Sequence, residues 1–333
     1  MKEHRPQITD RFGRIHDYLR ISLTERCNLR CFYCMPEEGI ELRDKTEFMT
    51  AEELIQIAKK FVDLGVKKIR LTGGEPLIKK NAAFIIQELG KLPVELAITT
   101  NAVVVDRFIN VFKDAGIQSV NVSLDSLDET RFNDISRRNY FKVIRKNIDA
   151  LIANKFTVKI NVVVIRNINE HEIIDFVRWS HRENVHIRFI EFMPFDGNHW
   201  KSEKKVSFDE ILKEVSRHLG ADGYHKISDA PNDTSKNFRV SGGLGTFGII
   251  SSITNPFCDT CNRIRLTADG KIKNCLFSEK ESDLLRALRE GHDLEQLIRS
   301  AVEQKFKERG GLSQFSNHEV QSRKNRAMTS IGG

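Results

Sequence analysis

The chain has 333 residues, 40% hydrophobic and 30% charged, with a formal net charge of +7. This composition suits a soluble globular protein of one large or two modest domains. No run approaches the roughly 18 apolar residues of a membrane span, so a membrane-spanning protein is excluded. The positive charge is consistent with a solvated basic surface, an RNA-binding face or a pocket for a polyanionic small molecule, and charge alone does not separate them.

The N-terminal twenty residues lack the apolar core of a secretion signal, and they interleave acids with arginines, unlike an organelle presequence. Six cysteines without an export signal indicate a reducing compartment, where thiols usually serve as ligands or catalysts. We therefore expect a cytoplasmic protein.

β-Branched runs alternate with helical patterns from residue 18 to about 200. The predicted strands span residues 18–24, 67–74, 95–101, 119–125, 157–165 and 186–193. The predicted helices include residues 51–65, 141–155 and 171–184. Thr50 and Glu53 form a capping-box pattern at the start of the first helix, and Gly65 offers a left-handed stop at its end.

Repeated βα units predict a parallel sheet covered by helices. Six units are too few for a complete eight-stranded barrel, so the expected fold is an α/β incomplete (β/α)6 TIM-like barrel, open along one side. A doubly wound open sheet is the alternative.

Beyond residue 200 the pattern changes. A helix is expected to end near Gly220, residues 221–238 are expected to be a loop, and β-rich stretches follow at 245–254 and 262–277. Asp269-Gly270 predicts a hairpin turn within the second stretch. Two short helices and a basic tail close the chain. We predict a barrel over residues 1–200 and an α+β extension over residues 201–333 that covers the open side.

Cys27, Cys31 and Cys34 are spaced C-x3-C-x2-C in "RCNLRCFYC". Zinc sites usually have four protein ligands and disulfides need pairs, so a group of three suits neither. An iron–sulfur cluster held by three thiolates would leave one iron open for a small molecule.

The unusual motifs of the first part all fall where predicted strands end. The cysteines follow the first strand, "TGGEP" (72–76) ends the second, "TTNA" (99–102) the third and "SLD" (123–125) the fourth. In βα barrels the active site lies on that face, so we expect the cysteines to belong to an active site. "GGEP" alone is most often just a turn, but its glycines would also let a ligand approach the backbone.

A second group, Cys258, Cys261 and Cys275, is spaced C-x2-C-x13-C. A zinc ribbon completed by a distant histidine is one interpretation, and a second three-thiolate cluster is the one we prefer. Because all six cysteines then fall into two sets of three, none is left over.

Several cationic residues lie near these motifs. Arg263 and Arg265 share one face of a predicted strand, as expected of a pair that binds an oxyanion. Arg20 and Arg70 lie on the first two strands, with surface charge as the alternative interpretation. Lys159 interrupts an apolar strand, where a lysine needs an anion or a solvent-filled cavity.

Two motif matches carry no weight. "GLGTFG" (243–248) is followed by a β-branched run where a dinucleotide site requires a helix, and "HEIID" (171–175) lacks the second histidine of a zinc-protease motif. The terminal Gly332-Gly333 would ordinarily be a frayed end.

C-x3-C-x2-C followed by "GGEP" resembles the radical S-adenosylmethionine (SAM) superfamily. C-x2-C-x13-C, "NRIRL" and the terminal Gly-Gly together resemble the GTP 3′,8-cyclase family, lyases that begin molybdenum cofactor biosynthesis. The resemblance runs from about residue 12 to the end of the chain. One departure is Ala102, where the family pattern has glycine after "TTN".

The resemblance implies two [4Fe–4S] clusters and SAM as cofactors and GTP as substrate. It implies that each cysteine group holds one cluster, with SAM on the first and guanine on the second. The implied SAM contacts are Tyr33, Gly74, Ser123 and Met193. The implied GTP contacts are Arg20, Arg70, Thr99, Lys159, Arg263, Ile264 and Arg265. The Gly332–Gly333 tail is implied to reach into the site and assist.

The implied reaction converts GTP to (8S)-3′,8-cyclo-7,8-dihydroguanosine 5′-triphosphate through a 5′-deoxyadenosyl radical. Its implied partners are a reducing electron donor and the next enzyme of the pathway, cyclic pyranopterin monophosphate synthase. No membrane or nucleic-acid partner is expected, and the chain is expected to be a monomer or homodimer. The alternatives are another two-cluster radical SAM enzyme that modifies RNA or a peptide, a non-enzymatic iron–sulfur protein, and a zinc protein.

Overall fold

The computed structural model describes residues 7–36, 39–40, 43–312, 315–318 and 325–332. Its first part alternates strands and helices. The elements are β1 (Tyr18–Ser22), α1 (Ala51–Asp63), β2 (Lys68–Thr72), α2 (Ala82–Gly90), β3 (Glu95–Thr100), α3 (Ile109–Asp114), β4 (Ser119–Ser123), α4 (Glu129–Ser136), α5 (Phe141–Ala153), β5 (Thr157–Val164), α6 (Ile173–Arg182) and β6 (His186–Glu191). All six predicted strands and the three predicted helices are confirmed.

The local signals of α1 act as predicted. The Thr50 hydroxyl accepts from the Glu53 N–H at 3.2 Å, and the Glu53 carboxylate accepts from the Thr50 N–H at 2.8 Å. Gly65 follows the helix with φ of +95°, a conformation that costs glycine little. The cap and the stop thus fix both ends of the helix that packs outside β1 and β2.

The second part contains α7 (Phe208–Leu219), β7 (Tyr224–Lys226), β8 (Lys236–Val240), β9 (Thr246–Ile250), β10 (Arg263–Leu266), β11 (Lys271–Lys273), β12 (Ser282–Asp283), α8 (Leu284–Arg289), α9 (Leu294–Glu303) and α11 (Met328–Ile331). The helix ending near Gly220 and the Asp269-Gly270 turn between β10 and β11 are confirmed.

Two expectations for this part were incomplete. Residues 221–238 are not all loop, because β7 and the first residues of β8 lie within them. β8 pairs with β9, and Phe238 stacks on Phe247 with ring centroids 5.3 Å apart. This tertiary pairing creates strands in a segment whose Asp, Pro, Asn and Ser residues indicate turns. The basic tail also contains a short helix, α11, which the sequence did not predict.

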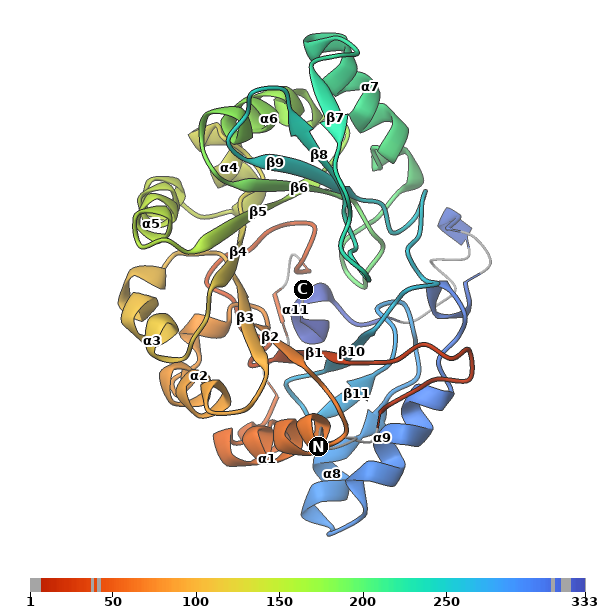
Figure 1. Ribbon diagram of the computed structural model, residues 1–333. Coiled ribbons are helices and arrows are strands. Elements are labelled where there is room, and N and C mark those ends of the chain that lie inside the picture. Colours follow the sequence, from red (N-terminus) through yellow and green to blue (C-terminus); the bar gives the residue numbers. More distant parts are fainter. Residues whose placement is uncertain (1–6, 37–38, 41–42, 313–314, 319–324, 333) are drawn as a thin grey trace, which may run out of the picture.

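The strands form a twelve-stranded sheet in the order β12-β11-β10-β1-β2-β3-β4-β5-β6-β9-β8-β7. Every neighbour from β10 to β9 pairs in parallel, and the outermost strands at each end pair antiparallel. The six-unit incomplete barrel is confirmed. The second part adds β9 to one edge and β10 to the other, so its strands continue the barrel wall across residue 200 (Figure 1).

Side chains alternate between two environments along the strands. On β5, Val158, Ile160 and Val162 are buried against the outer helices, whereas Lys159 and Asn161 lie on the opposite face. The hydrophobic core therefore lies between the sheet and the helices, and the inner face of the barrel is left for polar residues. Figure 1 shows α11 inside the ring of strands.

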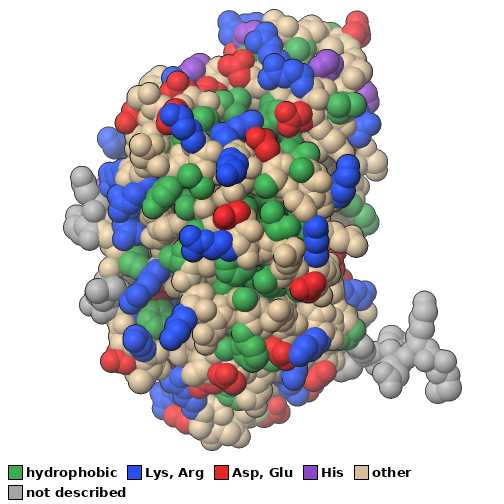
Figure 2. All heavy atoms as spheres, turned by 90° about the vertical axis from the view of Figure 1, so that its left-hand side faces the viewer, with side chains coloured by type: hydrophobic (Ala, Val, Ile, Leu, Met, Phe, Trp, Pro, Cys, Tyr) green, Lys and Arg blue, Asp and Glu red, His purple; other side chains and the backbone are tan. Residues whose placement is uncertain are grey.

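The outer face formed by α2, α3 and α5 carries basic and acidic side chains interspersed with one another (Figure 2). The net charge of +7 is therefore not gathered into one patch on this face. Within the described ranges, no helix has both the length and the apolar character needed to cross a membrane.

Candidate functional site

A cavity of about 300 Å³ lies where the parallel strands end, and all six cysteines line it. Thr72, Thr100 and Ser123, the last residues of β2, β3 and β4, also contribute to its wall. Two cysteine groups more than 200 residues apart in the chain thus meet at one site. This is the face of the barrel at which the strand-end motifs predicted an active site.

The loop after β1 presents Cys27, Cys31 and Cys34, which we call the first triad. The Leu29 N–H lies 3.4 Å from the Cys27 Sγ, and the Asn101 side-chain amide lies 3.7 Å from it. Burial raises the pKa of the Cys27 thiol to about 11, and Glu75 adds to the effect. Burial likewise raises the pKa of Cys31 and Cys34, with Asp125 contributing to both. The first triad is therefore buried near carboxylates.

The "GGEP" turn packs against the backbone of the loop that carries the first triad. A Cβ on Gly74 would lie 2.3 Å from the Arg26 carbonyl oxygen, so the glycine is required by the close approach of the cysteine loop itself. Glu75 then accepts hydrogen bonds from the Asn101 and Leu77 N–H groups and from the Thr100 hydroxyl. Burial raises the pKa of Glu75 to about 7 despite these bonds.

Cys258, Cys261 and Cys275, the second triad, lie before β10 and just after β11. The Lys305 Nζ is 3.4 Å from the Cys261 Sγ, and the Arg309 N–H is 3.5 Å from the Cys258 Sγ. Burial alone would raise the pKa of Cys261, but Lys305 and Arg263 outweigh it and hold that pKa at about 6. The second triad thus lies in a more cationic environment than the first.

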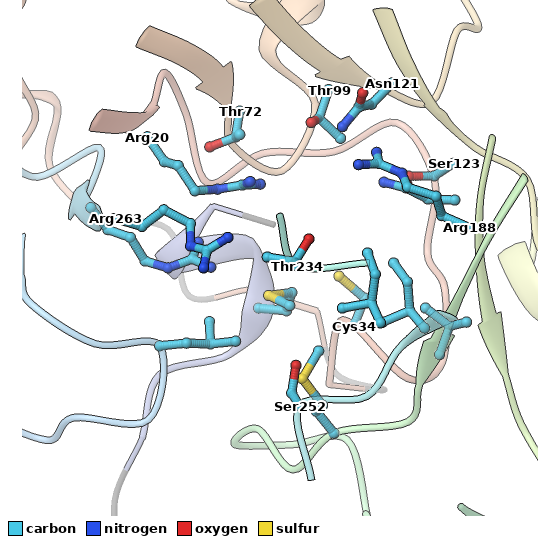
Figure 3. Close-up of a pocket in the computed structure, with 18 of the residues that line it drawn as sticks. Arg20, Cys34, Thr72, Thr99, Asn121, Ser123, Arg188, Thr234, Ser252 and Arg263 are labelled. Atoms are coloured by element: carbon cyan, nitrogen blue, oxygen red, sulfur yellow. The ribbon is translucent and has the colours of Figure 1, made fainter. Parts of the chain in front are cut away.

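Four arginines line the same cavity: Arg20, Arg188, Arg263 and Arg265. Arg20 and Arg265 are register partners on β1 and β10. Figure 3 shows Arg20 and Arg263 pointing into the cavity from one wall and Arg188 from the opposite wall. Their convergence from three strands makes the cavity a strongly cationic chamber.

Burial and mutual repulsion disfavour the charged form of these arginines. Burial lowers the pKa of Arg20 to about 10, and it lowers the pKa of both Arg188 and Arg265 to about 9, with neighbouring arginines adding to each shift. The Arg188 Nε is buried and has no hydrogen-bond partner within the described residues. The chamber therefore favours an anion that carries several charges.

Most of the other predicted contacts also line the cavity. They are Tyr33, Gly74, Thr99, Ser123 and Met193. The Tyr33 hydroxyl donates to Asp125 at 2.5 Å, which fixes the ring between two cysteines of the first triad. The Thr99 hydroxyl is buried without a hydrogen-bond partner within the described residues, so it is available to a ligand.

Four predicted residues do not line this cavity. Arg70 is buried beneath it, donating to the Tyr18 hydroxyl at 2.6 Å and to the Ile98 carbonyl at 3.0 Å. Lys159 lies on the inner face of β5, where burial, Arg188 and Arg70 lower its pKa to about 8. Ile264 alternates with the two arginines on β10, and its side chain therefore packs into the hydrophobic core.

Gly332 is the fourth of these residues. It reaches the ends of β1 and β2, where an added Cβ would lie 2.4 Å from the Thr72 Oγ1, and its carbonyl accepts a hydrogen bond from Arg265. Gly333 lies outside the described residues.

Ala102 has φ of +62°, a conformation that favours glycine. Its carbonyl accepts from the Asn147 side-chain amide at 2.7 Å, and its side chain is fully buried. The loop therefore keeps the left-handed backbone conformation at the position where the family pattern has glycine. The methyl group of Ala102 makes that conformation less favourable.

Sequence reasoning missed Arg188, Asn121 and Asn161, all of which line the cavity. Each is a polar residue between two apolar neighbours on its strand, the same signal that drew attention to Lys159. The side-chain oxygens of both asparagines are buried without hydrogen-bond partners within the described residues. Alternation along β4, β5 and β6 would have identified all three.

An ionic network connects the two loops that carry the triads. Arg326, just before α11, donates to both carboxylate oxygens of Asp269 at 2.9 Å and to Glu281 at 2.6 Å. Arg43 bridges Asp269 and Glu25, at 3.3 and 3.0 Å. Glu25 belongs to the loop of the first triad, and Asp269 forms the turn of the hairpin that carries the second. The network therefore joins both loops to the C-terminal tail.

Comparisons with known proteins identify the family. The chain matches the family model described as the radical SAM superfamily over residues 21–180 and that described as Molybdenum Cofactor Synthesis C over residues 185–310. A GTP 3′,8-cyclase of Listeria monocytogenes is 40% identical over 333 residues, which cover 98% of this chain and 99% of that protein. The chain belongs to the GTP 3′,8-cyclase family.

Eukaryotic members of the family are equally similar. The mitochondrial GTP 3′,8-cyclase of Arabidopsis thaliana is 42% identical over 98% of this chain and 83% of its own length. Molybdenum cofactor biosynthesis protein 1 of Drosophila melanogaster is 43% identical over 94% of this chain but only 56% of its own length. The chain spans about half the length of that protein and of its nematode and slime-mould relatives.

Among solved structures, Streptococcus suis SuiB bound to S-adenosylmethionine superposes with a TM-score of 0.64. The match covers 88% of this chain and 69% of SuiB, at 14% sequence identity. This likeness shows a shared radical SAM fold.

Membership of the radical SAM superfamily implies a [4Fe–4S] cluster and SAM, and the first triad fits that cluster. Its three cysteines are partly buried and line one cavity, and the Cys27 sulfur receives N–H groups, as the sulfurs of such clusters do. No three His, Cys, Asp or Glu side chains within the described residues converge as ligands of a single metal ion. Cubane thiolates need not converge in this way, because each binds a different iron atom.

Proposed function

We propose that this chain is a GTP 3′,8-cyclase lyase that converts GTP to (8S)-3′,8-cyclo-7,8-dihydroguanosine 5′-triphosphate, the first step of molybdenum cofactor biosynthesis. One observation carries the proposal: both triads and four partly buried arginines face one cavity. A triphosphate satisfies the arginines, and two separate three-thiolate groups suit two cofactor centres. The 40% identity to the Listeria cyclase, which extends over nearly the full length of that protein, supports the same substrate.

The first triad would hold the [4Fe–4S] cluster of SAM chemistry. Tyr33, Gly74, Ser123 and Met193 would position SAM beside it, since all four line the adjacent wall. Reduced cluster and SAM together supply the one-electron chemistry that abstracts a hydrogen atom. The Tyr33–Asp125 bond would hold the ring of Tyr33 in place in this half of the cavity.

The second triad would hold a second [4Fe–4S] cluster, with the guanine of GTP docked beside it. Arg20, Arg188, Arg263 and Arg265 would bind the triphosphate, and charge neutralisation would relieve the repulsion that lowers the pKa of three of them. Thr99 offers a hydroxyl to the nucleotide, whereas Arg70 and Lys159 add positive charge from below. Gly332 would close the site with its carbonyl held by Arg265.

The remaining parts of the proposal concern partners and location. A low-potential reductant would supply electrons, and cyclic pyranopterin monophosphate synthase would receive the product. A cytoplasmic location and a monomeric or homodimeric state stay predictions.

The test uses anaerobically reconstituted full-length protein, a chemical reductant, SAM and either GTP or RNA. We expect about eight iron and eight sulfide per chain, GTP-dependent 5′-deoxyadenosine and a cyclised triphosphate product. Stimulation of SAM cleavage by RNA or a peptide, with none by GTP, would instead identify an enzyme that modifies those substrates. Absence of 5′-deoxyadenosine under every condition would exclude the enzyme class.

A further inference from the structure

Lys305 is a buried lysine without a carboxylate partner. Only 2% of its surface is exposed, yet no carboxylate lies within ion-pairing distance among the described residues. Its ammonium group instead contacts the Cys261 Sγ at 3.4 Å and donates to the Arg263 carbonyl at 2.9 Å. A buried ammonium group needs a compensating negative charge, and the Cys261 sulfur is the contact that supplies one as a thiolate.

The neighbouring acid is already paired, so the Cys261 sulfur is the expected counterion of Lys305. Asp10, the nearby buried acid, is already bonded to Arg14 at 2.6 Å and to His16 at 3.0 Å. Burial, followed by the positive charge of Lys305, lowers the pKa of His16 to about 4, so this histidine is neutral near pH 7. Asp10 is therefore already paired, and the contact of the Lys305 ammonium group with a sulfur is the one to Cys261.

We propose that Lys305 is a positioning residue that acts through Cys261 and raises the reduction potential of the second cluster. The inference rests on the proposed second cluster. Adding an electron adds negative charge, which a fixed ammonium group beside a ligand sulfur stabilises.

A matched control exists in the same subdomain. Lys273 is equally buried, at 1% exposure, and lies two residues before Cys275. Its ammonium group donates to the Ser278 carbonyl and lies 3.7 Å from Glu281, so a carboxylate balances its charge, and its interaction with Cys275 is electrostatic without a hydrogen bond to the sulfur. Removing its charge should therefore affect the cluster potential far less than removing that of Lys305.

The experiment is a potentiometric titration of the reconstituted enzyme, followed by electron paramagnetic resonance of both clusters. In Lys305→Met we expect the reduced-to-oxidised ratio of the second cluster to fall about tenfold at a fixed potential, or about 59 mV for one electron. Lys305→Arg should restore most of it, and Lys273→Met should leave it near wild type. The first-cluster signal serves as an internal standard in every sample.

Each outcome is decisive. Loss of the second cluster in Lys305→Met and its retention in Lys305→Arg would also support charge compensation, and Lys305→Gln replaces Lys305→Met if that variant does not fold. An unchanged midpoint potential in Lys305→Met, or an equal shift in Lys273→Met, would overturn the inference. A wild-type enzyme with one cluster would overturn the proposed second centre itself, which iron analysis detects separately.

Discussion

The two triads each consist of three thiols but differ in their electrostatic surroundings. The first lies in one short loop, is nearest to Glu75 and Asp125, and has thiols whose pKa values burial raises. The second is assembled from a loop and a hairpin, contacts Lys305, and includes Cys261, whose pKa falls to about 6. Ligand spacing therefore specifies the kind of centre, and the neighbouring charges specify how two such centres differ.

The difference matches the proposed division of labour. A centre that cleaves SAM has to be strongly reducing, and nearby carboxylates favour that state. A centre that binds a nucleotide benefits from surrounding cations, which the arginines of β1, β6 and β10 provide. Substitutions that affect one half of the cavity should therefore separate the two activities.

The largest expected effect comes from removing one cysteine of each triad. Cys31→Ser should abolish 5′-deoxyadenosine formation, because the first cluster loses a ligand. Cys275→Ser should retain the first cluster and uncoupled SAM cleavage while the cyclised product disappears. Chromatography of both products and iron analysis measure this, and loss of both clusters in Cys275→Ser would refute the separation.

A smaller effect is expected from Arg188→Met, which removes one buried charge from the nucleotide half. Because charge-assisted hydrogen bonds contribute about 1.5–3 kcal/mol, GTP affinity should fall about tenfold to a hundredfold. SAM affinity, measured by calorimetry on the same sample, should change little. An equal loss of both affinities would show that the cavity is not divided as described. The exposed Arg178→Met is the control.

The smallest effect is expected at the hairpin of the second triad. Burial alone would raise the pKa of Asp269, but its bonds to Arg326 and Thr267 hold it at about 2. A carboxyl with a lowered pKa stabilises the fold above its unfolded value near 4, and that stability is lost as the pH falls towards 2. Asp269→Asn should therefore lower the unfolding free energy by about 2 kcal/mol at pH 7.

Chemical denaturation at several pH values tests this expectation. The difference between Asp269→Asn and wild type should disappear as the pH approaches 2. Asp175→Asn, which breaks an exposed pair with Arg178, is the matched control and should change stability by less than about 1 kcal/mol. A pH-independent difference would show that the carboxylate charge does not stabilise the hairpin.

Much of the fold could be predicted because its signals are local. The capping residues Thr50 and Glu53 and the β-branched runs act within a few residues, and the first triad could be placed because parallel strands end on one face. The pairing of β8 with β9 was missed because it depends on tertiary contacts.

The candidate site was less predictable for the same reason. Lys305 lies 44 residues from Cys261, and nothing local indicates that their side chains meet. Arg188 could have been found from its position in an apolar strand, whereas the orientation of Ile264 follows from alternation once the strand register is known. Pairing between distant residues, rather than their chemical type, limited the prediction.

The bridge from Glu25 through Arg43 and Asp269 to Arg326 makes the segment before α11 a brace between both cysteine-bearing loops. Because Arg326 follows all six cysteines in the sequence, every thiol can be present without this brace. Loss of Arg326 would remove the brace and leave all six thiols in place, so the geometry of both cysteine loops depends on a residue outside either triad.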